Sequence, residues 1–185
     1  AFGSFDNQIT RRGYVTAQMD HIWSERSTVQ SWFDVEAALA RVQTAIGMIP
    51  VGTGARITSQ ARATDTVMTQ ILDGESGNPL RYALDDDPRQ WVHYGATTQD
   101  ILDTARSLQI RNSLNLIADC TDKLLKRIRD LAGRHAETLM VARTNGQHAV
   151  PTTLGMRFAR WVADLERSRD RLSEVRKRCL LVQFS

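Results

Sequence analysis

The part of the sequence with the most chemical capacity is residues 91–100, which read WVHYGATTQD and lead into a long helical pattern. Its threonines and its aspartate are residue types that cap a helix N-terminus, so one interpretation is structural, with His93 as a hydrogen-bonded histidine. The same geometry can bind an anion, because the first N–H groups of a helix have no intrahelical acceptor and lie at its positive end. One capping residue meets the structural need, whereas Thr97, Thr98 and Gln99 form a cluster that begins four residues after His93. We therefore predict an anion site here.

Residues 142–153, which read ARTNGQHAVPTT, form a second polar run that is also followed by a helical pattern. Around a glycine that lets backbone approach closely, this run places side chains that form directional hydrogen bonds. These side chains are Arg143, Thr144, Asn145, Gln147 and His148. Taken alone, the run is a solvated turn and His148 is a histidine at a helix start, although an imidazole there can also face a ligand as an acid or base. Because both runs stand at the head of a long helix, we expect them to face the same ligand.

The elements that position these runs are predicted from hydrophobic periodicity. Apolar residues spaced by three and four predict helices over residues 27–46, over residues 98–131 and from Pro151 to near the end of the chain, with a weaker pattern over residues 58–72. A helix of roughly thirty residues is ~45 Å long, which is typical of an extended bundle. No alternating strand pattern is found, so the sequence predicts an all-α fold and argues against α/β folds with phosphate-binding loops.

The domain organisation is predicted from breaker residues between positions 74 and 88, including NP at 78–79 and DDDP at 85–88. They indicate a small helical N-terminal domain over residues 1–90, followed by the first part of a central helical bundle over residues 91–185. The last residues are apolar and carry no helix stop signal, so we expect the bundle to be incomplete and the chain to be part of a longer protein.

Composition limits the kind of protein and its surroundings. Lys+Arg 24 against Asp+Glu 21 gives a net charge of +3, and both signs alternate over residues 157–178, which argues against a nucleic-acid tract. The two cysteines, Cys120 and Cys179, lack metal-ligand spacing and indicate a reducing compartment. No apolar run approaches the ~20 residues of a membrane span, and no signal peptide is seen. We predict a cytoplasmic protein with no metal, no cofactor, no nucleic-acid partner and no membrane contact.

The two polar runs resemble signature segments of the fumarase/aspartase superfamily. Residues 93–100, HYGATTQD, are similar to its H-x-G-x-T-S-x-D segment, and residues 143–153, RTNGQHAVPTT, are similar to its R-T-H-x-Q-x-A-x-P-x-T segment. IWSE at 22–25, DVEAALA at 34–40 and GMIP at 47–50 resemble the branch that contains adenylosuccinate lyase and 3-carboxy-cis,cis-muconate cycloisomerase. The likeness covers nearly the whole chain, in matching order and spacing.

This resemblance implies a homotetramer of long-helix bundles, with active sites shared between subunits and a small polycarboxylate as substrate. A base removes a proton beside a carboxylate, which becomes a doubly charged aci-carboxylate, and the leaving group departs. Such a dianion requires fixed hydrogen-bond donors, which two helix heads would provide. The residues that the resemblance assigns to catalysis are His93, Thr144 and Gln147. Those that it assigns to substrate binding are Thr97, Thr98, Gln99, Asn78, Asn145 and His148.

Two departures from the family pattern bear on the substrate. Asn145 stands where the second segment has a histidine, and Asn78 lies in the stretch where adenylosuccinate lyases carry another catalytic histidine. Asparagine forms hydrogen bonds but exchanges no proton near neutral pH, so both departures resemble the cycloisomerases. Adenylosuccinate lyase stays an alternative, with Arg11, Arg12 and Tyr14 as contacts for a nucleotide phosphate.

A third alternative is a catalytically inactive structural relative, because two proton-exchanging groups are lost, although His93, Thr97 and Thr98 are kept. The family's base lies on a glycine- and serine-rich loop that this sequence lacks, and we expect that loop beyond residue 185. The chain would then carry the substrate-holding half of a site without its base.

Overall fold

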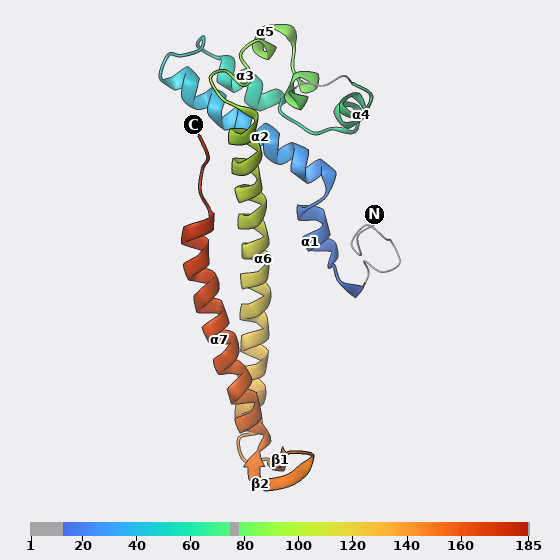
Figure 1. Ribbon diagram of the computed structural model, residues 1–185, viewed down its shortest axis with the longest axis vertical. Helices are drawn as coiled ribbons and strands as arrows, with labels where there is room; N and C mark the ends of the chain where they lie inside the picture. The colour runs from blue at the N-terminus through green and yellow to red at the C-terminus, as the bar shows by residue number, and fades with distance from the viewer. Residues whose placement is uncertain (1–12, 75–77, 185) are drawn as a thin grey trace. The chain divides into compact units, whose positions relative to one another are not determined.

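The computed structural model describes residues 13–74 and 78–184, most of which are helical (Figure 1). The predicted all-α fold is confirmed, apart from a small two-stranded sheet. The elements in chain order are α1 (Ala17–Ile22), α2 (Glu25–Ala45), α3 (Thr53–Gln60), α4 (Asp65–Asp73), the 3-10 helix η2 (Pro79–Ala83), α5 (Asp86–Arg89), α6 (Thr98–Arg134), β1 (Leu139–Thr144), β2 (Gln147–Thr153) and α7 (Leu154–Cys179). The described residues form two compact units, one with the residues up to 113 and from 180 on, the other with residues 114–179. The predicted domain junction near residue 90 stays a prediction.

Helix α2 contributes one buried face to the core of the first unit. The Ser24 hydroxyl accepts a hydrogen bond from the Ser27 N–H (3.3 Å) and caps the first turn. The helix ends at Ala45, shortly before Gly47, whose φ of 75° is typical of a helix C-terminus. The helix predicted over residues 27–46 is therefore confirmed. The buried apolar core around α2 contains Val29, Phe33, Ala37, Ala40, Ile49, Ile57, Ala61, Ala63, Val67, Leu80, Leu84 and Val92.

The weak helical pattern over residues 58–72 corresponds to parts of two helices, α3 and α4, and the prediction of a single helix there is wrong. Hydrogen bonds from α2 stabilise the break between them. The Gln30 amide donates to the Ala61 carbonyl (3.1 Å) and accepts from the Ala63 N–H (2.9 Å). The Thr64 hydroxyl then caps α4.

Helix α6 begins at Thr98, as predicted, and continues past its predicted end. In the first unit its polar residues bind the end of α1 and the residue that follows it. The Gln109 amide donates to the Ile22 carbonyl (2.9 Å), and the Trp23 indole donates to the Ser113 hydroxyl (3.0 Å). Because buried polar groups are stable when they are hydrogen-bonded, these contacts fix the first half of α6 to the N-terminal helices.

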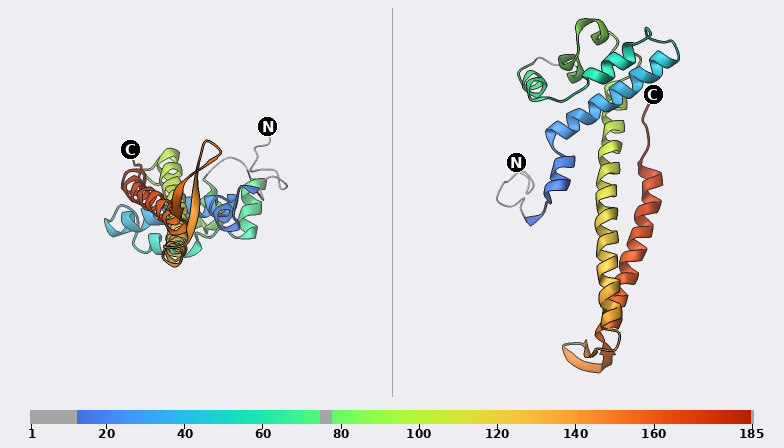
Figure 2. Two further views of the ribbon diagram at one scale, coloured as in Figure 1. Left: turned by 90° about the horizontal axis from the view of Figure 1, so that it is seen from below. Right: turned by 180° about the vertical axis from the view of Figure 1, so that it is seen from behind.

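In the second unit, the C-terminal part of α6 and helix α7 lie side by side (Figure 2). Ion pairs between Arg129 and Glu166 and between Arg169 and Asp122 (3.6 Å) join the two helices. Leu125 of α6 is buried in this unit. Within the part of the chain that the structure describes, no helix combines the length and the apolar character needed to cross a membrane.

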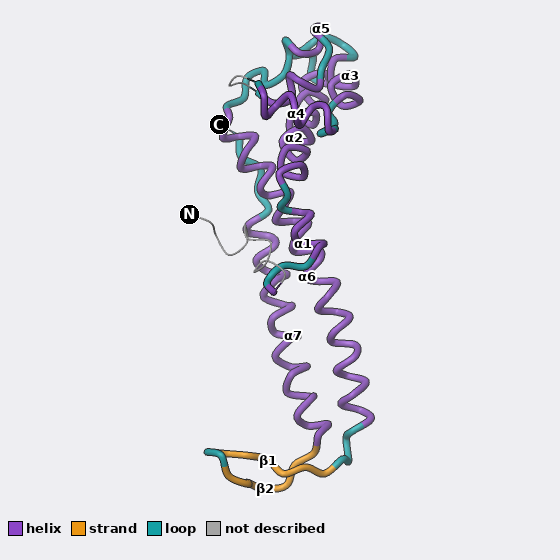
Figure 3. Tube along the Cα trace, turned by 90° about the vertical axis from the view of Figure 1, so that its right-hand side faces the viewer, coloured by secondary structure: helices purple, strands orange, loops and turns teal. Residues whose placement is uncertain are grey.

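A β-hairpin connects α6 to α7 (Figure 3), so the prediction that the chain contains no strand is wrong. β1 pairs antiparallel with β2, and Thr144 faces Gln147 across a two-residue loop. The loop residues Asn145 and Gly146 have φ values of 48° and 74°, as in the type I′ turns that connect hairpin strands. Pro151 lies within β2, and α7 begins at Leu154. The prediction that this helix begins at Pro151 is therefore wrong.

Candidate functional site

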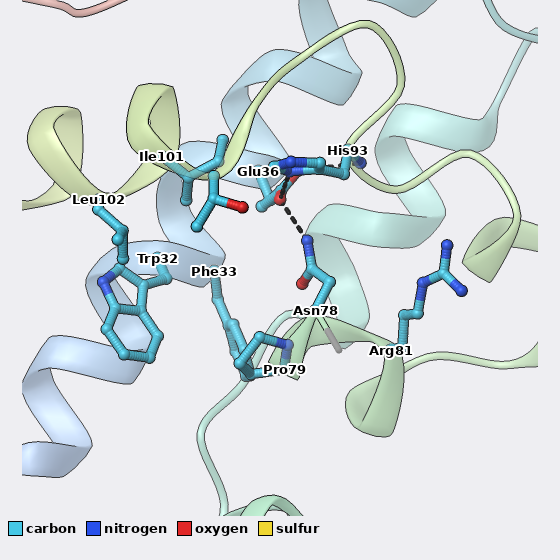
Figure 4. A pocket seen from close by; sticks show the side chains of 10 residues that line it. Trp32, Phe33, Glu36, Asn78, Pro79, Arg81, His93, Ile101 and Leu102 are labelled. Carbon is cyan, nitrogen blue, oxygen red and sulfur yellow. Dashed lines mark hydrogen bonds and ion pairs between the residues drawn. The ribbon is translucent and has the colours of Figure 1, made fainter. Parts of the chain in front are cut away.

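A pocket of about 630 Å³ in the first unit brings together three of the predicted site residues, Asn78, His93 and Thr98 (Figure 4). Helix α2 supplies an aromatic wall, the first turns of α6 supply an aliphatic wall, and the segment around η2 supplies polar groups. The other residues that line the pocket are Trp32, Phe33, Glu36, Pro79, Arg81, Ile101 and Leu102. Largely apolar walls with a few convergent polar groups are typical of small-molecule sites.

The Glu36 carboxylate connects the polar residues of this pocket. Its Oε1 atom lies 2.7 Å from His93 Nδ1 and accepts a hydrogen bond from Asn78 Nδ2 at 2.6 Å. Its Oε2 atom accepts a hydrogen bond from the His93 backbone N–H at 3.1 Å. Glu36 is only 3% exposed, and a buried carboxylate is tolerated when it is paired and hydrogen-bonded in this way. Because a carboxylate only accepts, Nδ1 is the ring nitrogen that donates to it, and Nε2 is left for a ligand.

The oxygen and the nitrogen of the Asn78 side-chain amide both form hydrogen bonds within the protein. Its oxygen accepts a hydrogen bond from the Leu80 N–H (3.0 Å) and caps η2, while its nitrogen donates to Glu36. An amide nitrogen carries two N–H donors, so one donor of Asn78 is left for a ligand in the pocket. The predicted role of Asn78 in substrate binding therefore stays a prediction that the pocket geometry supports.

The N-terminus of α6 has the donors that an anion site requires. The buried Asp100 carboxylate accepts a hydrogen bond from the Thr97 N–H (2.9 Å), as the third helical residue does in a capping box. Among the residues that the structure describes, no hydrogen-bond acceptor is found for the N–H groups of Thr98 and Gln99. All three residues, Thr97, Thr98 and Gln99, are exposed, and of these Thr98 lines the pocket. The aspartate meets the structural need, and the remaining donors are available to a negatively charged ligand.

The second polar run lies at the tip of the β-hairpin, in the second unit. Thr144, Asn145, Gln147 and His148 are all exposed there. His148 lies in β2 and pairs with Arg143 of β1, so its interpretation as a histidine at a helix start is wrong. That this run and the pocket of the first unit face the same ligand stays a prediction.

Two polar residues of the pocket, Glu36 and Arg81, were not predicted from the sequence as site residues. A signal for Glu36 was present, because it lies between Phe33 and Ala37 on the buried face of α2, where a carboxylate requires a partner. Arg81 follows a stretch of breaker residues and carried no such signal. Its guanidinium is a permanent positive charge at the pocket, which suits an anionic ligand (Figure 4).

The chemistry that this arrangement supports is the binding of carboxylates. His93 supplies an imidazole, Arg81 supplies a cation, and Thr98 supplies a hydroxyl and a helix-terminal N–H. Within residues 13–74 and 78–184, no three His, Cys, Asp or Glu side chains gather into a group that could hold a metal ion. Fixed donors around a bound carboxylate also stabilise any negative charge that it gains during a reaction.

Comparison with known proteins gives the class to which this fold and site belong. The sequence matches the model of a family described as Lyase over residues 48–185. The chain therefore belongs to this lyase family, and its resemblance to the fumarase/aspartase superfamily is confirmed.

The relatives include both enzymes of the branch indicated by the motifs. Adenylosuccinate lyase from Methanocaldococcus jannaschii is 36% identical over 174 residues, which cover 89% of this chain and 38% of that protein. The 3-carboxy-cis,cis-muconate cycloisomerase from Pseudomonas aeruginosa is 37% identical, over 96% of this chain and 41% of that protein. The crystal structure of 3-carboxy-cis,cis-muconate lactonizing enzyme from Pseudomonas putida matches with a TM-score of 0.83 at 37% identity, over 96% of this chain and 43% of that one. The chain thus spans less than half the length of these relatives.

Proposed function

We propose that the full-length protein is an enzyme that makes or breaks a C–O or C–N bond beta to a carboxylate, through an aci-carboxylate intermediate. The observation that carries this proposal is the pocket in which His93 and Arg81 lie with the start of α6. Membership of the lyase family supports the reaction class. A small polycarboxylate is the proposed substrate, and no cofactor is invoked.

The N-terminus of α6 is the proposed site for the carboxylate next to the reacting carbon. When that carbon loses a proton, the carboxylate gains a second negative charge, and donors fixed at the helix terminus stabilise it more strongly than they stabilise the substrate. A second carboxylate would bind Arg81 and His93 Nε2. The apolar wall formed by Trp32, Phe33 and Leu102 would hold the carbon skeleton between the two charged groups.

The hairpin tip is the proposed second source of donors. Thr144 and Gln147 face each other across the turn and are exposed, so their side chains are free to reach a ligand. Asn145 and His148 lie beside them. In the proposed homotetramer these residues would complete a pocket of another subunit. The catalytic base is expected beyond residue 185.

The proposed substrate is closer to carboxymuconate than to adenylosuccinate. Asn78 and Asn145 stand where adenylosuccinate lyases are expected to carry histidines, and each asparagine has a structural role here. Asn78 caps η2, and Asn145 adopts the left-handed conformation that asparagine tolerates well. Adenylosuccinate lyase stays the second candidate because relatives with that name are about as similar as the cycloisomerase. Of the residues expected to contact its phosphate, Arg11 and Arg12 lie outside the described residues.

The experiment that tests this proposal is an ultraviolet absorbance assay of the full-length protein with carboxymuconate and with adenylosuccinate. We expect turnover of carboxymuconate. Turnover of adenylosuccinate alone would reverse the ranking of the two substrates, and turnover of neither would support an inactive structural relative.

A further inference from the structure

We propose that Glu36 is a positioning residue of this site, which fixes His93 and Asn78 in the geometry that binds the ligand. This inference rests on the proposed function and adds to it a residue that acts through others. The Glu36 side chain is 2% exposed, and both of its oxygens are engaged by neighbouring residues. Although Glu36 lines the pocket, its oxygens already accept hydrogen bonds from His93 and Asn78, so we assign its effect on the ligand to these two residues.

The backbone of His93 shows why it requires a partner. Its φ of 63° lies in the left-handed region, which residues other than glycine rarely adopt. Such a conformation persists when the surrounding structure over-determines it. Glu36 accepts one hydrogen bond from the His93 backbone N–H and pairs with its ring, so a single carboxylate fixes both the backbone and the imidazole.

The same carboxylate sets which groups of the pocket are presented to a ligand. Because Glu36 occupies His93 Nδ1, Nε2 is the ring nitrogen that a ligand can use. Because Glu36 also accepts from Asn78, the amide oxygen of Asn78 points to the Leu80 N–H and its second N–H is left free. One buried charge on α2 thereby organises the segments that contain residues 78 and 93.

A purely structural role is the competing explanation, in which Glu36 only ties α2 to the loop before α6. Gln43 offers a matched comparison for that role. It lies on the same helix, is also 3% exposed, and donates to the Tyr94 carbonyl at 2.6 Å. Gln43 thus holds the same loop through a backbone carbonyl, whereas Glu36 binds the side chains of His93 and Asn78.

The test is a double-mutant cycle in the full-length protein, with Glu36→Gln, His93→Asn and the two combined. For each variant, kcat/KM, the affinity for the reaction product and Tm are measured. If turnover of a variant is too slow to measure, the coupling is calculated from the product affinities instead. We expect Glu36→Gln to lower kcat/KM or product affinity by about tenfold or more in the natural background, a size typical of coupled neighbours. In the His93→Asn background the same substitution should have much less effect, because the imidazole that Glu36 positions is gone and only its hydrogen bond with Asn78 remains.

Gln43→Leu serves as the control in the same cycle. It should lower Tm and change kcat/KM by the same factor with and without His93. Either of two results would overturn the positioning role. One is that Glu36→Gln lowers kcat/KM or product affinity by the same factor with and without His93. The other is that Gln43→Leu couples to His93 as strongly as Glu36→Gln does. If Glu36→Gln does not fold, Glu36→Asp, which keeps the charge on a shorter side chain, takes its place with the same outcomes. Failure of the proposed function is seen separately, as absence of turnover in the unmutated protein.

Discussion

Thr98 stands at the start of α6 with a hydroxyl and an N–H available to the pocket, so it tests the anion site at the scale of a single residue. The bound carboxylate gains negative charge in the transition state, and each donor therefore matters more for turnover than for binding. We expect Thr98→Val to lower kcat by roughly 100-fold, the scale for loss of one such donor, and to leave the helix content unchanged. Steady-state kinetics and circular dichroism of the full-length enzyme measure both.

Thr64 is the matched control, because its hydroxyl caps α4 by accepting from the Val67 N–H at 3.3 Å. Thr64→Val should leave kcat unchanged and reduce stability by ~1 kcal/mol, which corresponds to a few degrees in Tm. If Thr98→Val and Thr97→Val behaved in the same way, with near-normal kcat and lowered Tm, both threonines would be caps and the anion site would be wrong.

Asn78 tests the buried hydrogen bonds of Glu36. Asn78 Nδ2 lies 2.6 Å from Glu36 Oε1. In Asn78→Asp a carboxylate oxygen replaces this nitrogen, so a donor is lost and two negative groups lie within hydrogen-bond distance. We expect Asn78→Asp to reduce the free energy of unfolding at neutral pH by ~2 kcal/mol. Asn112, which is exposed on α6, is the control, and Asn112→Asp should have little effect. Thermal unfolding measures the stability of both variants. Equal losses of unfolding free energy would contradict the role assigned to the Asn78 amide.

The residues of the pocket were partly predictable because His93 and Thr98 belong to a dense polar run and Asn78 stands at a departure from a family motif. Their common partner was not predictable in the same way. Glu36 precedes His93 by 57 positions, and the fold brings them together through the packing of α2 against the segment before α6. Only the conflict of a carboxylate with its apolar neighbours indicated a buried partner.

At the scale of elements, periodicity predicted the long helices well because apolar residues recur along each of them at steps of three and four. It missed the break between α3 and α4, because the hydrogen bonds that stabilise this break come from Gln30 on another helix. It also missed the hairpin. No residue of β1 or β2 is buried, and residues 139–142 are all apolar, so the sequence shows no alternation of apolar and polar residues there. The usable signal was local, the Asn145-Gly146 dipeptide that type I′ turns favour.

The hairpin turn makes its own prediction, because Gly146 has a φ of 74°. A β-branched residue in this left-handed conformation costs ~1–2 kcal/mol, so we expect Gly146→Val to lower Tm by several degrees. Gly133 is the control within α6, where an added Cβ would have no neighbour within 4 Å. Gly133→Ala should maintain or raise Tm, because alanine is the better helix former. Equal losses of Tm in thermal unfolding would contradict the type I′ turn.

At the scale of the whole molecule, the second unit buries too little apolar surface to be stable alone. The buried hydrophobic side chains among residues 114–179 are Leu125 and Ile128, at 1% and 9% exposed. Larger fractions of Ile117, Leu124, Met156, Trp161 and Val175 are exposed on its helices. Since full burial of one such side chain contributes ~1.5–3 kcal/mol, further protein is required over these faces. This supports the homotetramer that we propose, while the cytoplasmic location stays a prediction.

The tetramer is tested by sedimentation equilibrium of the full-length protein at micromolar concentration, where we expect the mass of four chains. Leu124 is 45% exposed on α6 and provides the sharper test, because a charge at a buried apolar interface is costly. Leu124→Glu should shift the protein toward smaller species. Lys126→Glu is the control, since successive helical residues turn by about 100° and residue 126 faces away from residue 124. A stable monomer of the unmutated protein would contradict the assembly, and equal dissociation by both variants would remove Leu124 from the interface.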